Sequence, residues 1–153
     1  MKQNTQKVVN FCCRDRQQFG WLSNFQDSAF FAGGKIWPTV EHFYQAMKTT
    51  SKTEREWVRT SKTPKEAKRR GKKVTIRPDW EDIKVEVMRW ALKKKFSQNP
   101  WLKKKLIATG EAMLVEDAPW DPFWGTGAGS GKNMLGVLLM EVREIFLNLE
   151  KTP

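Results

Sequence analysis

Three polar residues at helical spacing, Glu41, Gln45 and Lys48, are the side chains of this sequence best placed to do chemistry. They recur at i, i+4 and i+7, so they share one face of a helix. Thr39 is a good N-cap, which puts Glu41 in the first turn, where the helix dipole favours an ionised carboxylate. Two turns, about 10 Å at 1.5 Å per residue, separate Glu41 from Lys48, so their long side chains can reach one ligand. The stripe predicts either a cleft wall or, as spacing alone favours, a partly solvated helix face.

Asp121 is a second carboxylate that could take part in the same reaction. It lies in the segment Trp120–Trp124, just before a run of glycines. An aspartate before a proline commonly forms an Asx turn, which is the simpler interpretation. The functional interpretation makes it the partner of Glu41, because cleavage of a glycosidic bond usually requires two carboxylates. Both interpretations stay open from the sequence.

The glycine-rich segment Gly125–Lys132 invites comparison with a phosphate-binding loop. It does not match a P-loop, because Thr126 takes the place of the first glycine and Asn133 replaces the residue that would bind magnesium. Exposed backbone N–H groups, the start of the following helix and the Lys132 ammonium would together form an anion site. A flexible glycine loop is an equal alternative.

Aromatic and basic residues could hold a planar, phosphorylated substrate. Stacking on an indole stabilises a bound base by ~1–3 kcal/mol. Five of the eight tryptophans fall in loops or at the starts of elements and are candidates for stacking: Trp21, Trp37, Trp80, Trp120 and Trp124. Trp57, Trp90 and Trp101 fall within predicted helices and are expected to pack. The basic segment 65–73, which includes Arg69, predicts either a solvated helix face or phosphate contacts.

The composition narrows the class of protein. A formal charge of +11 and a pI near 9.8 attract polyanions, so nucleic acid or a phosphorylated small molecule is the expected partner. His42 is the only histidine, and Cys12 and Cys13 are adjacent, so we expect no metal site, no cofactor and no disulfide. His42 is next to Glu41, but neighbours in a helix point about 100° apart, so a role as a helix-surface or core-edge residue is favoured for His42. No signal peptide or membrane-spanning run is evident, so a soluble, cytoplasmic protein is expected.

The hydrophobic pattern predicts a compact, mostly helical α+β domain with a small sheet or hairpin. The domain is expected to span residues 8–149, between tails at 1–7 and 150–153. Capping boxes at Ser51 and Thr63 predict two short helices, and Asp79 is a candidate N-cap. The other expected elements are a strand over 8–13, a hairpin over 30–37, helices that start near Val40 and Trp80, a helix from Asn99-Pro100 to Gly110, a strand over 112–115, a loop over 116–132 and a final helix from Asn133 to Leu149.

Several motifs in order, from Val9 to about Leu149, resemble the NADAR (YbiA-like) N-glycosidase family. The motifs are Phe19-Gly20-Trp21-Leu22-Ser23-Asn24-Phe25, Trp37-Pro38-Thr39-x-Glu41-His42-x-Tyr44-Gln45-Ala46-x-Lys48, Ala67-x-Arg69-x-Gly71, Trp80-Glu81-x-x-Lys84, Asp121-x-x-Trp124-Gly125 and Gly131-Lys132-Asn133-x-Leu135-Gly136. The resemblance implies an α+β fold and an N-glycosidase that splits a ribose C1′–nitrogen bond. Glu41, Lys48 and Asp121 match positions expected to be catalytic. Those expected to bind substrate are Gly20, Asn24, Arg69, Trp80, Trp124, Gly125, Lys132 and Asn133.

The resemblance implies two substrate classes, ADP-ribosylated guanine in DNA or RNA and phosphoribosylamino-pyrimidine intermediates of riboflavin synthesis. The high positive charge favours the nucleic acid, and Thr126 stands where some riboflavin-linked members have an aspartate. The leading hypothesis is hydrolysis through an oxocarbenium-like state or an opened ribose, with the carboxylates stabilising positive charge and steering water. Lys48 is the second candidate nucleophile, since an amine whose pKa is lowered by burial can form a Schiff base if the ribose opens. A non-catalytic module that binds ADP-ribose or nucleic acid is the alternative of another class, although two retained carboxylates suit a binder of phosphates poorly.

Overall fold

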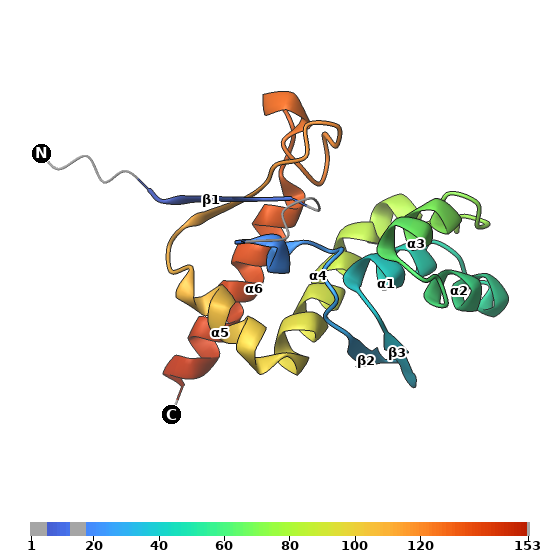
Figure 1. The fold of residues 1–153 in the computed structure, drawn as a ribbon, viewed down its shortest axis with the longest axis horizontal. Coiled ribbons are helices and arrows are strands. Elements are labelled where there is room, and N and C mark those ends of the chain that lie inside the picture. The colour runs from blue at the N-terminus through green and yellow to red at the C-terminus, as the bar shows by residue number, and fades with distance from the viewer. Residues whose placement is uncertain (1–5, 13–17, 153) are drawn as a thin grey trace, which may run out of the picture. The chain divides into compact units, whose positions relative to one another are not determined.

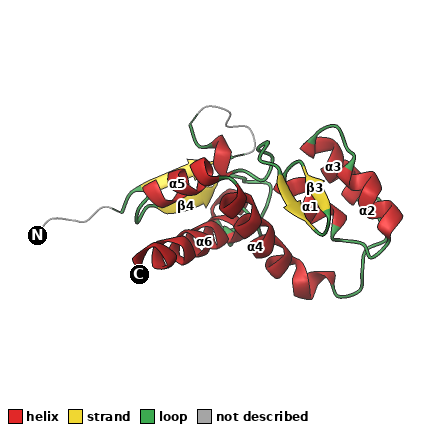
Figure 2. Ribbon diagram, turned by 90° about the horizontal axis from the view of Figure 1, so that it is seen from below, coloured by secondary structure: helices red, strands yellow, loops and turns green. Residues whose placement is uncertain are grey.

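The computed structural model describes residues 6–12 and 18–152, which form two compact units. One unit comprises Met1–Ser23 and Pro100–Pro153, and the other comprises Asn24–Asn99. Helices predominate in both units and strands are few, which confirms the predicted α+β class (Figure 2). No helix among the described residues is long and apolar enough to cross a membrane. The predicted domain boundaries stay a prediction.

In the unit Asn24–Asn99, a hairpin precedes the helix that carries Glu41. Strands β2 (Phe30–Ala32) and β3 (Lys35–Trp37) are antiparallel, as the sequence predicted. Gly33 and Gly34 form the turn with φ of +57° and +76°, a conformation that glycine adopts without a steric cost.

The four helices of this unit begin close to where the capping residues predict. Thr39, Ser51 and Thr63 each accept a backbone N–H in the first turn of their helix. Asp79 occupies an N-cap position but does not cap, because its carboxylate binds the Arg77 guanidinium over 2.6 Å instead. The helices are α1 (Val40–Ala46), α2 (Lys52–Arg59), α3 (Pro64–Gly71) and α4 (Trp80–Gln98).

Helix α1 forms the centre of this unit, in contact with α2, α3 and α4 (Figure 1). Its Phe43 ring packs edge-on against Trp37 and stacks on Trp90. Tyr44 meets the Trp80 ring at a centroid distance of 5.0 Å. All seven residues of α1 are buried, so its polar side chains lie inside the protein.

In the other unit, a strand near the N-terminus pairs in parallel with a strand about a hundred residues later in the sequence. Strand β1 (Val8–Phe11) pairs with β4 (Met113–Glu116). The strand predicted over 8–13 ends at Phe11, and Cys13 lies outside the described residues. Helices α5 (Pro100–Ala108) and α6 (Met134–Lys151) complete the unit, and α6 packs against β4 and α5 (Figure 1). Helix α6 extends two residues beyond the predicted Leu149.

Candidate active site

Glu41 is held at the start of α1 through both its backbone and its side chain. Its backbone N–H donates to the Asn24 carbonyl over 3.1 Å, and Gln45 Nε2 donates to Glu41 Oε1 over 2.7 Å. Glu41 and Gln45 are only 5% and 3% exposed. The interpretation of this stripe as a partly solvated helix face is therefore wrong for these two residues. A buried carboxylate that accepts a hydrogen bond is better suited to a catalytic role than to the role of a solvated surface charge.

Lys48 follows α1 and is half-buried. Burial lowers the pKa of its ammonium, and the positive charges of Lys68 and Lys72 lower it further, while Glu41 and Glu81 oppose these shifts. The Nζ atom also lies 5.7 Å from the centre of the Tyr44 ring. A lowered pKa increases the fraction of neutral amine, which is the form in which a lysine acts as a nucleophile, and this role of Lys48 stays a prediction.

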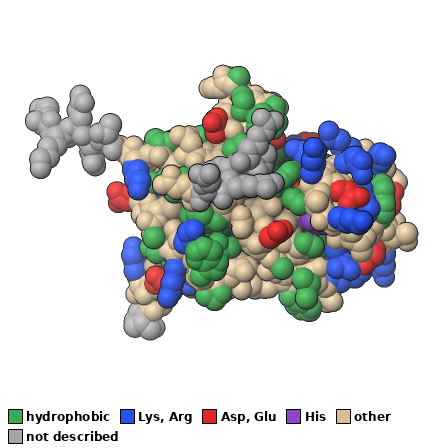
Figure 3. Space-filling model, viewed as in Figure 1, with side chains coloured by type: hydrophobic (Ala, Val, Ile, Leu, Met, Phe, Trp, Pro, Cys, Tyr) green, Lys and Arg blue, Asp and Glu red, His purple; other side chains and the backbone are tan. Residues whose placement is uncertain are grey.

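The basic segment 65–73 forms a charged face next to this helix. Lysine and arginine side chains gather over the part of the molecule that holds α2 and α3 (Figure 3). Within α3, Lys68 acts on the Lys48 ammonium, and Arg69 is 72% exposed with an ion pair of 3.6 Å to Glu66. The face is thus solvated at Arg69, and it also contributes positive charge near Lys48.

Asn24 and Trp80, both expected to bind substrate, lie in the same unit as Glu41 and Lys48. The Asn24 amide is buried and donates weakly to Met88 Sδ, while its Oδ1 accepts no hydrogen bond from the residues that the structure describes. Trp80 is 5% exposed and packs against Tyr44. The free indole face predicted for Trp80 is thus largely used for packing, and its contact with substrate stays a prediction.

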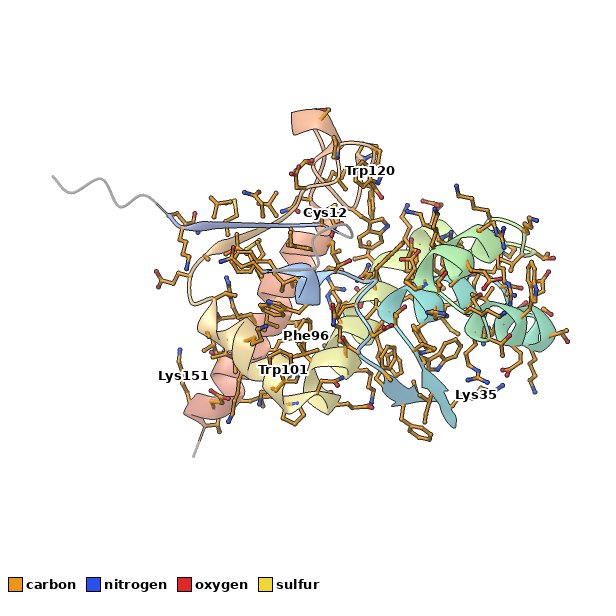
Figure 4. All side chains as sticks on the ribbon, in the orientation of Figure 1. Cys12, Lys35, Phe96, Trp101, Trp120 and Lys151 are labelled. Carbon is orange, nitrogen blue, oxygen red and sulfur yellow. The ribbon has the colours of Figure 1, made fainter. Side chains whose placement is uncertain are left out.

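Asp121, in the other unit, forms the turn that the simpler interpretation predicts. Its Oδ1 accepts backbone hydrogen bonds from Phe123 over 3.0 Å and from Trp124 over 2.8 Å. Figure 4 labels Trp120, which opens this loop and is half exposed. Asp121 is itself only partly buried. The Asx turn is confirmed, and it uses one carboxylate oxygen and leaves the other outside the turn.

The glycine-rich loop is hydrogen-bonded along its backbone, so it is neither an open anion site nor a flexible loop. The N–H groups of Lys132 and Asn133 donate to the carbonyls of Pro122 and Gly125 over 2.9 Å each. The first two residues of α6 likewise donate to the carbonyls of Phe123 and Trp124, just before the glycine-rich segment. A Cβ on Gly131 would lie 2.4 Å from the Gly125 carbonyl, so the backbone is tightly wound. The predicted anion site is therefore wrong for these N–H groups, which already have partners. The Lys132 ammonium is exposed, 5.5 Å from the centre of the Phe123 ring.

Asn133 holds the loop against strand β4. Its Oδ1 accepts the Glu116 N–H and its Nδ2 donates to the Leu114 carbonyl, both over 2.9 Å. The residue has a φ of +48°, which asparagine adopts more readily than most residues. Gly136 is required nearby, because a Cβ there would lie 2.1 Å from the Leu114 carbonyl. The Asn133 amide is thus committed to the fold.

The structure brings part of the predicted site together in one unit. Asn24, Glu41, Lys48, Arg69 and Trp80 belong to the unit Asn24–Asn99. The other unit holds Gly20, Asp121, Trp124, Gly125, Lys132 and Asn133. The expected pairing of Asp121 with Glu41 joins residues of different units and stays a prediction.

Two further residues of the Glu41 unit bear on the site. His42 is 1% exposed, with Nδ1 2.8 Å from Thr39 Oγ1 and Nε2 3.1 Å from the Ser61 carbonyl. It therefore has a structural role, but it lies inside the core and not at the helix surface or core edge that was expected. Burial lowers its pKa. The sequence analysis did not name Lys68. Its position one residue before Arg69 in a basic helix could have identified it as a residue near the site.

Comparison with known proteins places the sequence among N-glycosidases and riboflavin-related proteins. The sequence model of the NADAR domain family matches residues 10–147 of this chain. The chain is 42% identical over 140 residues to N-glycosidase YbiA of Escherichia coli, which covers 90% of this chain and 87% of that protein. It is 40% identical over 131 residues to a riboflavin biosynthesis protein of Vibrio vulnificus, covering 84% of this chain and 36% of that protein. The NMR structure of Escherichia coli YbiA superposes with a TM-score of 0.85 at 38% identity, over 99% of this chain and 94% of that one.

Proposed function

The chain belongs to the NADAR domain family, and we propose that this N-glycosidase removes ADP-ribose from ADP-ribosylated guanine in DNA or RNA. The reaction splits the bond between C1′ of the ribose and a nitrogen of the base. A module that binds its ligand without turnover is not favoured, because relatives that match most of the chain are N-glycosidases.

The observation that carries the proposal is the joint placement of Glu41 and Lys48. An acid that is nearly buried and hydrogen-bonded lies two helical turns from an amine whose pKa is lowered by burial. A neutral amine attacks C1′, and a carboxylate stabilises the positive charge that develops there as the bond to the base breaks. The pair therefore supplies an electrostatic stabiliser from α1 and a nucleophile from the turn that follows it.

The proposed reaction passes through a covalent intermediate on Lys48. The Lys48 amine forms a bond to C1′ as the bond from C1′ to the base breaks, and the base leaves with a proton. Opening of the ribose ring then gives a Schiff base between Nζ and C1′. Water adds to C1′, and the bond from C1′ to Nζ breaks, which releases ADP-ribose and restores the neutral amine. Glu41 is proposed to stabilise charge at C1′ and to orient the water.

Positive charge near the reacting groups supports a substrate with phosphates. Lys68 and Lys72 lie close enough to Lys48 to affect its pKa, and Arg69 extends into solvent from the same helix. A diphosphate or a nucleic-acid backbone gains from such a group of cations. The net charge of +11 supports a polyanionic substrate further.

Riboflavin intermediates are the second candidate substrates. The Vibrio vulnificus relative at 40% identity is named a riboflavin biosynthesis protein, and the chain spans about a third of its length. A phosphoribosylamino-pyrimidine has the same C1′–nitrogen bond and one phosphate. The same residues would act on it, so the two candidates differ in the base and in the number of phosphates.

Product analysis distinguishes the two candidates. The purified protein is incubated separately with an ADP-ribosylated guanine oligonucleotide and with a ribosylaminopyrimidine phosphate, and the released sugar is followed by mass spectrometry. We expect ADP-ribose and an unmodified oligonucleotide from the first, at a kcat/KM about 100-fold or more above that for the second. Exclusive turnover of the pyrimidine would transfer the proposal to the riboflavin candidate. Turnover of neither would contradict it.

A further inference from the structure

The side-chain amide of Gln45 lies against Glu41 from one turn further along α1. Its Nε2 donates to Glu41 Oε1 over 2.7 Å, and both residues are almost completely buried. Hydrogen bonds to a charged group are stronger than those between neutral groups, and burial strengthens them further. The reaction proposed above gives Gln45 no task.

The orientation of this amide is informative. Among the described residues, none donates a hydrogen bond to Gln45 Oε1, although that atom is buried. An acceptor left without a donor costs free energy. Turning the amide over would place Oε1 against the Glu41 carboxylate, and an ionised carboxylate can only accept. The amide thus leaves its own oxygen without a partner and gives its donor to Glu41.

Gly71 of α3 provides the space that this orientation needs. A Cβ at residue 71 would lie 2.0 Å from Gln45 Oε1 and 2.8 Å from Gln45 Cβ. A helix is less stable with glycine than with alanine in its interior. Glycine at residue 71 is therefore favoured by the space it leaves for Gln45, with which any larger side chain would collide. The close approach of α3 to Gln45 therefore depends on the missing side chain.

We propose that Gln45 is a positioning residue for the glycosidase reaction, which holds the Glu41 carboxylate ionised and in one rotamer, in a space that Gly71 keeps open. The role of Glu41 in turnover rests on the proposed function. The effect of Gln45 on the Glu41 carboxylate concerns the free protein and is measured without substrate.

Other charges also act at this end of α1. Lys48 interacts with Glu41, and Lys68 of α3, Lys72 just after α3 and Glu81 of α4 interact with Lys48. The Lys48 ammonium lies near Glu41 in every variant that keeps it. The contribution of Gln45 is therefore measured as a difference between wild type and variants at residue 45 alone.

The first measurement follows Glu41 itself in the absence of substrate. Carboxyl carbons of labelled glutamate are titrated by NMR in wild type and in Gln45→Met, and Glu41→Gln identifies the resonance. Methionine keeps the length of the side chain but cannot donate. We expect Glu41 to protonate at a higher pH in Gln45→Met, because the carboxylate loses a donor that favours its charged form. An unchanged titration would overturn the proposal.

The second measurement is kinetic. Gln45→Met is expected to lower kcat about 10-fold or more, with KM changed less than 3-fold, because the carboxylate that acts in turnover is no longer held in place. Gly71→Ala, which displaces the amide without changing it, is expected to lower kcat in the same way and to raise the pH at which Glu41 protonates in the NMR titration. If Gln45→Met left kcat unchanged in an active wild type, the proposal would be contradicted.

A matched control separates positioning from packing. Gln98 lies in the same unit and uses its amide to pair with both backbone groups of Phe31. Gln98→Met makes the same chemical change at an exposed structural site, and we expect it to leave the Glu41 titration and kcat unchanged. An equal shift in both variants would show a general effect of the substitution and would refute a specific role for Gln45. If wild type released no product, the proposed function would fail, while the NMR titration would still decide whether Gln45 acts on Glu41.

Discussion

Burial lowers the pKa of the Lys48 ammonium, and the Glu41 carboxylate, two turns earlier in the chain, partly opposes that shift. Lys68 and Lys72 act in the same direction as burial. A lysine in such surroundings holds more neutral amine near neutral pH than a solvated lysine does. The unit Asn24–Asn99 thus contains a buried acid in α1 and, just after α1, an amine whose pKa is lowered by burial and by nearby lysines.

Lys48→Arg is expected to lower kcat about 100-fold or more and to leave KM nearly unchanged. Arginine keeps the positive charge but stays protonated, so it supplies no neutral nucleophile. Steady-state kinetics with the ADP-ribosylated oligonucleotide measure the change. Lys73→Arg, an exposed change in the same basic segment, serves as the control. Retention of wild-type kcat in Lys48→Arg would rule out the amine as nucleophile.

The acidic limb of the pH profile, where activity rises with pH, is expected to depend on the neighbours of Lys48. Activity requires the neutral amine, so it rises with pH through the Lys48 pKa. Lys68 and Lys72 lower that pKa, so the double variant Lys68→Gln/Lys72→Gln raises it and moves the rise in activity to higher pH. The profile of kcat against pH tests this, with Lys65→Gln as a control in the same helix. A rise that moved to lower pH would contradict the assignment.

Substitutions at Asp121 separate its turn from its charge. Asparagine can also form an Asx turn, so Asp121→Asn keeps the acceptor for Phe123 and Trp124 and removes only the charge. If the carboxylate takes part in catalysis, as the sequence predicts, kcat falls about 10-fold or more while the melting temperature stays within about 2 °C. Normal kcat in Asp121→Asn, with loss only in Asp121→Ala, would limit the residue to its structural role.

Asn133→Ala is expected to destabilise the fold by roughly 2–4 kcal/mol. The substitution leaves the Glu116 N–H and the Leu114 carbonyl without their partner and places alanine at a φ of +48°. Urea unfolding measures the loss. Asn148→Ala, at an exposed position of α6, provides a matched control and should change stability by less than about 0.5 kcal/mol. Equal stability of the two variants would contradict the role assigned to the Asn133 amide.

Local patterns in the sequence predicted most of the elements, because local chemistry determines them. The capping residues Ser51 and Thr63 and the pair Gly33-Gly34 placed two helices and a hairpin within one or two residues. The parallel pairing of β1 with β4 was not predictable in this way. It joins residues about a hundred positions apart, and short apolar runs do not encode their partners.

The sequence predicted which residues belong to the candidate site better than it predicted their burial and their hydrogen-bond partners. Spacing placed Glu41, Gln45 and Lys48 on one helix face but favoured solvent there, because spacing does not reveal what packs against a face. Asp79 failed as a cap since Arg77, two residues away, takes its carboxylate. The N–H groups of the glycine-rich segment were expected to be open, but most of them donate to backbone carbonyls within residues 116–127.

Borohydride trapping of the covalent intermediate tests the central claim most directly. The wild-type protein is mixed with the ADP-ribosylated guanine oligonucleotide, reduced during turnover, digested and analysed by mass spectrometry. We expect an adduct on Lys48 with the mass of ADP-ribose less one oxygen atom, absent from Lys48→Arg and from samples without substrate. Turnover without any adduct, or an adduct that persists in Lys48→Arg, would contradict the proposed reaction.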